Sequence, residues 1–248
     1  MSNHQIISKE THRNYRIITD RSDALGDGVM HAMTFPMEFR ALQSYYPILC
    51  CKHADSEVFY PAALFGLEQN ENLFLENDKW NADYVPMMIE MAPFLIGFEV
   101  SAEKNQDDTP VVAIDMDSPR VNLEKGQPLF DENGEPSGFL KDTAMLLDNI
   151  HRGNEQNKGF IEALLENNLL ESCTIKLSLV DGSGRELREF YSINESNLSK
   201  LSGTVLEKLN SQDYLEAIFM MIASLSRVSY LIDKKNVSVL RSASRPTH

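Results

Sequence analysis

The sequence predicts an α+β fold, with a mostly antiparallel sheet in the N-terminal half and helices plus a β-hairpin in the C-terminal half. Short runs rich in β-branched, aromatic and alternating apolar residues dominate positions 14–117. After residue 137 the apolar residues recur every three or four positions, which is typical of amphipathic helices. Strands therefore come first and helices later, an order that does not favour an alternating parallel sheet.

The N-terminal half contains a series of predicted strands, each bounded by turn signals. They are Tyr15–Thr19, Val29–Phe35, Ile48–Cys51, Val58–Leu67, Asn72–Leu75, Phe94–Val100 and Val111–Asp115. A helix over Met37–Tyr46 is expected among them, because Pro36 suits a first helical turn and Pro47 ends it. A second helical turn is expected at Pro86–Met91.

The middle of the chain, residues 101–136, carries turn signals instead of periodicity. Ala102–Thr109 is polar without an apolar stripe, so an exposed loop is expected there. Asn133-Gly134 favours a tight turn. The aspartate beside it suggests calcium, but the spacing lacks the ligands of an EF-hand, and no metal site is predicted.

The C-terminal half is predicted to be mainly helical. Two helices, Ser137–Arg152 and Lys158–Leu169, are expected to pack as a pair, because Gly153 and Gly159 break the path between them. Alternating residues on either side of Asp181-Gly182-Ser183-Gly184 predict a hairpin of strands Thr174–Val180 and Glu186–Ile193.

The last part of the chain begins with a short helix expected at Asn194–Leu201. Ser211 or Asp213 is predicted to cap a longer helix that starts near Tyr214. Residues 236–248 lose the apolar periodicity, and this tail is expected to be flexible. We therefore expect one domain over residues 1–248, with a β-rich part at 12–117 and a mainly helical part at 137–232.

Charge and composition limit the partners of the chain. A formal charge of -14 repels phosphate backbones, so no nucleic-acid partner is expected. The N-terminus lacks the apolar core of a secretory signal, which favours a cytoplasmic, soluble protein. No membrane span is predicted, because the best candidate, residues 214–232, is interrupted by Glu216, Arg227 and several serines. The 3 cysteines are expected to be reduced.

Two small sets of polar residues are candidates for chemistry. His53-x-Asp55 offers two ligands of a facial iron triad, but no suitably placed second histidine follows it. Asp115 and Asp117 would point to one side of a strand end, where repulsion between them favours acid and base work. The other interpretation is a plain strand-to-turn exit at Asp117-Ser118-Pro119.

The segment Tyr60–Val100 carries the single Trp and a dense set of aromatic and methionine residues. Its large side chains suit a protein core. They also suit a binding surface, because methionine adapts to its partner and aromatic faces favour peptides or flat ligands. In that second interpretation Asn72, Trp80 and Tyr84 form the rim of a groove for a partner protein or a small aromatic ligand.

The punctuation of this segment, including Tyr60-Pro61, Trp80 and Pro93-Phe94, resembles that of the bacterial SapC family. The resemblance extends over roughly residues 12–232. It implies a link to surface-layer components or to an uptake or halogenase-associated system. We accordingly expect a non-enzymatic accessory or interaction protein without a cofactor, whose oligomeric state stays open. The alternative is a metal-dependent enzyme of unrecognised type that uses Asp115, Asp117 and a histidine.

Overall fold

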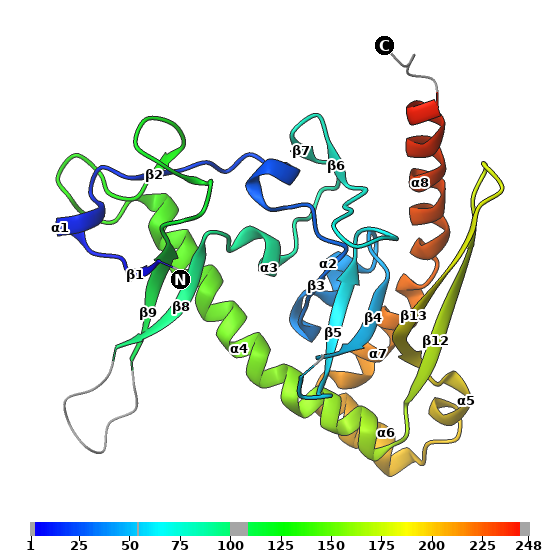
Figure 1. Cartoon of the computed structure of the whole chain (residues 1–248). Helices are drawn as coiled ribbons and strands as arrows, with labels where there is room; N and C mark the ends of the chain where they lie inside the picture. The colour runs from blue at the N-terminus through cyan, green and yellow to red at the C-terminus, as the bar shows by residue number, and fades with distance from the viewer. Residues whose placement is uncertain (1–2, 54, 100–108, 244–248) are drawn as a thin grey trace.

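The computed structural model describes residues 3–53, 55–99 and 109–243. Within these ranges the chain forms helices and antiparallel sheets, which confirms the predicted α+β class. Figure 1 shows a smaller β-rich end that contains both β1 and β9, and a larger end built on a longer sheet. The predicted loop Ala102–Thr109 lies almost wholly outside the described residues; Thr109, its last residue, opens a strand.

The largest sheet joins the two halves of the sequence. Its strand order is β12-β13-β4-β5-β3, and every neighbouring pair is antiparallel. The strands are β3 (His31–Met33), β4 (Ile48–Lys52), β5 (Phe59–Leu64), β12 (Leu170–Ser178) and β13 (Gly184–Ile193). The predicted hairpin is therefore present, and β13 pairs with β4 at Tyr191 opposite Cys50.

Smaller sheets complete the β structure. One has the order β1-β9-β8, formed by His4–Ile6, Thr109–Asp115 and Phe94–Glu99. Another pairs β2 (Arg16–Ile17) with β10 (Val121–Asn122) and β11 (Gln127–Pro128). The third is β6 (Leu75–Glu76) with β7 (Lys79–Trp80). The predicted strand Tyr15–Thr19 is thus reduced to two residues.

Short helices connect these strands. They are α1 (Lys9–His12), η1 (Asp23–Leu25), η2 (Pro36–Glu38), α2 (Phe39–Leu42) and α3 (Met87–Glu90). The helix predicted over Met37–Tyr46 is present only as η2 followed by α2, with turns at its end. The helical turn predicted at Pro86–Met91 corresponds to α3.

The prediction of two paired helices after residue 137 is wrong, because one helix, α4, runs without a break from Gly138 to Glu166. Its buried residues keep one helical face throughout, from Leu140 and Leu147 to Phe160 and Leu164. Gly153 lies on that face, where a Cβ would stand 2.5 Å from Cγ of Phe35. Glycine at this position therefore permits close packing and does not end the helix.

Helices follow the hairpin to the end of the described residues. They are α5 (Glu195–Leu198), α6 (Gly203–Ser211), α7 (Tyr214–Ser224) and α8 (Arg227–Ala243). Helix α8 continues into the tail 236–248 as far as Ala243, where Asn236 accepts the Val180 N–H and Arg241 pairs with Glu76. Flexibility of this tail stays a prediction, and residues 244–248 lie outside the described ranges. Asp213 precedes α7 but makes no side-chain capping bond, since its backbone is left-handed at φ 60°.

The stretch Tyr214–Arg241 is long and apolar enough to cross a membrane by length and composition alone. Core helices of folded proteins pass the same test, and in α7 the side chains of Ala217, Ile218 and Met221 are buried. The sequence-based expectation of no membrane span stays a prediction.

Two hydrophobic clusters lie along α4. The larger contains the strands of the five-stranded sheet, α7 and the C-terminal part of α4, including Phe160 and Leu164. The smaller contains Phe94, Ile114 and the N-terminal part of α4, including Leu140 and Leu147. A single helix thus supplies side chains to both clusters, and Figure 1 shows it running from one end of the molecule to the other.

Candidate functional site

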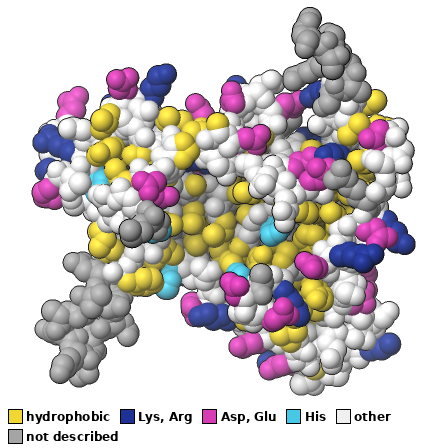
Figure 2. All heavy atoms as spheres, in the orientation of Figure 1, with side chains coloured by type: hydrophobic (Ala, Val, Ile, Leu, Met, Phe, Trp, Pro, Cys, Tyr) yellow, Lys and Arg dark blue, Asp and Glu magenta, His cyan; other side chains and the backbone are white. Residues whose placement is uncertain are grey.

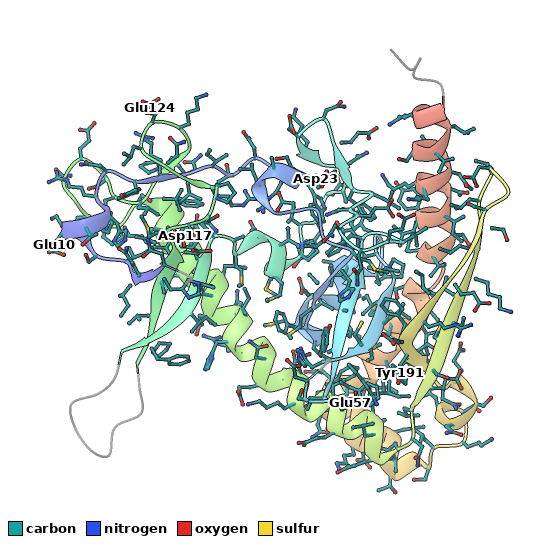
Figure 3. The ribbon with its side chains drawn as sticks, in the orientation of Figure 1. Glu10, Asp23, Glu57, Asp117, Glu124 and Tyr191 are labelled. Carbon is teal, nitrogen blue, oxygen red and sulfur yellow. The ribbon has the colours of Figure 1, made fainter. Side chains whose placement is uncertain are left out.

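A hollow with a volume of about 750 Å³ lies on the five-stranded sheet. We call it the aromatic groove and define it by His31, Cys51, His53, Tyr60 and Phe190. Glu57 and Tyr191 also line the aromatic groove, and both are labelled in Figure 3. Glu57 lies in the turn between β4 and β5, and Tyr191 lies on β13. Figure 2 shows hydrophobic side chains filling the middle of this face of the molecule, with charged side chains around them.

The antiparallel pairing of β4 and β5 places the groove residues on one face. Cys51 lies directly opposite Tyr60, so both side chains project to the same side of the sheet. His53 follows Cys51 by two residues and shares its side. Residues from β3 and β13 form the sides of the groove. These two strands lie more than a hundred positions apart in the sequence, so the groove forms only when the whole sheet is assembled.

Ring contacts order the groove. The His53 and Tyr60 rings lie with centroids 4.3 Å apart and planes tilted by 31°. His31 meets the edge of Phe190 at 6.1 Å and 86°. These are favourable geometries for aromatic pairs, and they hold flat apolar surfaces toward the hollow. The arrangement suits contact with a planar or apolar group of another molecule.

Charged residues surround these rings. Nζ of Lys52 lies 2.9 Å from a Glu57 carboxylate oxygen, and Arg188 lies 2.7 Å from Glu186. The side chain of Glu189 has no hydrogen-bond or ionic partner in the described part of the chain. Its backbone has φ 70°, at the position where the β12–β13 register shifts between Cys173 and Ile175. Such bulges reorient a side chain locally, and this one lines the groove.

Burial keeps three groups of the aromatic groove uncharged at neutral pH, namely those of Cys51, Tyr60 and His31. Burial raises the pKa of the Cys51 thiol to about 12, and a hydrogen bond with Tyr60 opposes part of that shift. Burial likewise raises the pKa of the Tyr60 phenol to about 12. Burial lowers the pKa of His31, which leaves the imidazole neutral. A protonated thiol is a poor nucleophile, so this chemistry favours contact over covalent reaction.

The structure places the predicted rim residues in an internal hydrogen-bond network beside the larger cluster. Asn72 is buried and donates to the backbone oxygen of Asp27 at 2.8 Å. The Trp80 indole N–H donates to the Tyr46 hydroxyl at 2.7 Å. The Tyr84 hydroxyl donates to buried Glu38 at 3.0 Å. Their polar atoms thus bind the protein itself, and a ligand-binding role for them stays a prediction.

Asp115 and Asp117 lie at the end of β9, as the sequence indicates. A carboxylate oxygen of Asp115 accepts the Asp117 backbone N–H at 3.1 Å. Asp117 in turn accepts the backbone N–H of Asn3 at 3.2 Å. These bonds match the strand-to-turn interpretation. His4 is paired with Asp115 across the sheet, whereas His31 and His53 lie in the aromatic groove.

Metal ligation has no geometric support in the described residues. No group of three His, Cys, Asp or Glu side chains among them is placed to hold an ion. Within His53-x-Asp55, both side chains are exposed, and the His53 ring lies against the Tyr60 ring.

Sequence reasoning treated the groove residues separately. It placed Cys51 at the end of a strand, considered His53 as a metal ligand, and gave Phe190 no role beyond the hairpin. Extending the predicted hairpin alternation across β4 and β5 would have placed Cys51, His53 and Tyr60 on one face. The contribution of β13 had no local signal, because it depends on which strand the hairpin joins.

These observations define an acidic α+β protein with an aromatic surface groove and two cores along one helix. Residues 7–231 match the model of the SapC family, which covers most of the 248-residue chain. The chain therefore belongs to the SapC family. No curated protein and no solved structure matches it.

Proposed function

We propose that this SapC-family protein is a non-enzymatic accessory protein that acts by binding another molecule in the aromatic groove. The observation that carries the proposal is the convergence of aromatic rings and a protonated thiol around a hollow of about 750 Å³. The proposal places the protein in the cytoplasm. Through the family resemblance, it links the protein to a surface-layer, uptake or halogenase-associated system.

The groove has the composition of a binding site. Rings supply large contact areas, while the ion pairs of Lys52 and Arg188 leave polar groups at the margin. Its volume of about 750 Å³ falls in the range of ligand pockets. The neutral Cys51 and Tyr60 avoid the desolvation cost that charged groups would impose on a partner.

Binding can be tested with three probes that share one ring: benzamide, benzamidine and benzoate. We expect at least one to shift the NMR signals of Tyr60 and Phe190 saturably in the full chain. Tyr60→Ala should weaken that binding about tenfold, because it removes the central ring. His53→Ala, at an exposed position, should weaken it about threefold with less risk to the fold.

Phe98→Ala is the matched control, since Phe98 is 53% exposed on β8 and lies outside the groove. It should leave probe affinity unchanged. The groove assignment would be wrong if no probe perturbed groove signals, or if the three variants behaved alike. Stoichiometric iron or zinc in the purified protein, lost in Asp115→Ala, would instead support the metal-dependent enzyme.

A further inference from the structure

A second hollow, of about 610 Å³, meets the aromatic groove. We call it the α8 hollow; it lies between residues 68–76 and α8, and Tyr230 and Asp233 line it. Gln69 and Asn70 line both hollows. Asn70 turns the chain there with φ 58°, a conformation that asparagine tolerates. The two hollows therefore form one elongated surface across the segment 68–76.

This elongated surface is predominantly acidic. The side chains that line the two hollows include eight carboxylates and four cationic groups, with histidine taken as neutral. The carboxylates are Asp23, Glu57, Glu68, Glu71, Glu76, Glu186, Glu189 and Asp233; the cationic groups are Lys52, Arg188, Lys234 and Arg241. The surface thus carries the same sign of charge as the whole chain.

The cationic groups of this surface are already engaged. Lys52, Arg188 and Arg241 form ion pairs with Glu57, Glu186 and Glu76. Lys234 lies over the rings of Phe74 and Tyr230, with centroids 5.0 and 5.3 Å from Nζ. This contact shows that the α8 hollow accommodates a cation against aromatic faces.

Three lining carboxylates have no hydrogen-bond or ionic partner of their side chains within the described ranges: Asp23, Glu189 and Asp233. Glu189 belongs to the aromatic groove end, and the other two belong to the α8 hollow. Unpaired negative charge is therefore available at both ends of the elongated surface. It is combined with rings at both ends, namely Tyr60 and Tyr230.

We infer that the binding partner is a protein that lays an extended segment bearing arginine or lysine side chains along both hollows. This inference rests on the proposed function and specifies its partner. Cationic side chains complement the unpaired carboxylates and stack favourably on the rings. The net charge of -14 attracts such a segment from a distance. The elongated shape favours an extended peptide segment, because a single compact ligand would fill only one of the two hollows.

The test uses the full chain and three fluorescein-labelled octapeptides that alternate alanine with arginine, citrulline or glutamate. Citrulline has the shape of arginine without its charge. Fluorescence anisotropy should show the arginine peptide binding at least tenfold tighter than the citrulline peptide at 20 mM salt. That advantage should fall severalfold at 300 mM salt, because salt screens exposed charges.

Variants then locate the contact. Glu189→Gln and Asp233→Asn should each weaken the arginine peptide about threefold and leave the citrulline peptide unchanged. Glu207→Gln is the control, because Glu207 is exposed on α6 and lines neither hollow. An Asp233→Asn variant with unchanged affinity would overturn the extended arrangement.

Equal affinity for the arginine and citrulline peptides, or tighter binding of the glutamate peptide, would overturn the inferred charge preference. If His53→Ala still weakened such charge-independent binding, the proposed function would stand and the inference would fall. Absence of any response to the benzamide series would instead remove the proposed function itself.

Discussion

At the residue scale, the terminal nitrogens of the buried Arg120 guanidinium are held by specific partners. Arg120 and Asp27 are both almost fully buried and lie 2.6 Å apart. Arg120 also donates to the backbone oxygens of Ile18 and Asp20. Removing one partner of such a pair leaves a buried charge and costs about 3–5 kcal/mol. Arg120, which directly precedes β10, therefore ties the segment 18–27 to that strand.

Glu38 gives a residue-scale prediction about pH. Burial raises the pKa of this carboxyl, although Thr34, Tyr84 and the Met87 backbone N–H donate to it. The folded state thus holds the proton more tightly than the unfolded chain. The stabilisation from the protonated form is complete below the unfolded pKa and is lost as pH rises through the raised value.

Urea unfolding of the unmodified chain and Glu38→Gln, from pH 4 to 8, checks this prediction. The variant does not titrate at this position, so the stability advantage of the unmodified chain should shrink as pH rises. The control Glu207→Gln should differ from the unmodified chain in unfolding free energy by the same amount at every pH. A difference for Glu38→Gln that does not change with pH would contradict the argument.

At the element scale, local signals predicted strands and turns better than they predicted helix length. The hairpin of β12 and β13 was predictable because Asp181-Gly182-Ser183-Gly184 encodes its turn. The continuity of α4 was not predictable, because glycine, the residue type at position 153, commonly ends helices. Only the position of Phe35 in space shows why glycine is needed there.

Gly153→Ala is expected to destabilise the fold by about 1–2 kcal/mol. Alanine favours a helix by about 1 kcal/mol over glycine, but a Cβ at 2.5 Å from fully buried Phe35 overpacks the core. Gly138→Ala should be neutral or slightly stabilising, because no neighbouring heavy atom lies within 4 Å of a Cβ added at this position. Urea denaturation of both variants measures the contrast, and equal stabilisation by both would show that Phe35 does not constrain the helix.

The candidate site shows the same limit of sequence reasoning. Tyr60 and Trp80 were both recognisable as members of an aromatic segment, yet only Tyr60 lines the aromatic groove. Trp80 directs its N–H to Tyr46, a residue outside that segment. Which aromatic side chain faces a hollow depends on strand register and on the partner strand β13. Neither is encoded within the segment Tyr60–Val100.

At the scale of the whole molecule, α4 couples the two hydrophobic clusters. Its N-terminal part packs in the smaller cluster and its C-terminal part in the larger one. Breaking this helix between them would expose the close contact of Gly153 with Phe35. We therefore expect the two clusters to unfold in one transition, as the single-domain prediction requires.

The single Trp provides the measurement. Trp80 packs against the larger cluster, whereas Ile114 is buried in the smaller one. Ile114→Val should cost about 0.5–1.5 kcal/mol and shift the urea midpoint of Trp80 fluorescence by the same amount as the far-UV signal. Ile6→Val, at a position 50% exposed, should shift neither. Separate midpoints for the two signals would mean that the clusters unfold independently.

The hairpin of β12 and β13 has a consequence for the range of molecules that the protein accepts. It pairs with the rest of its sheet at Tyr191 opposite Cys50, while its own two strands pair along most of their length. Figure 1 shows its turn extending beside α8, away from β4. The hairpin forms an arm that is held at Cys50 and also near its turn, where the Val180 N–H donates to Asn236 of α8 at 3.0 Å. The twist of this arm between the two points therefore sets the width of the aromatic groove. Relatives that differ only in the length or twist of the arm would accordingly select differently sized guests while keeping identical rings.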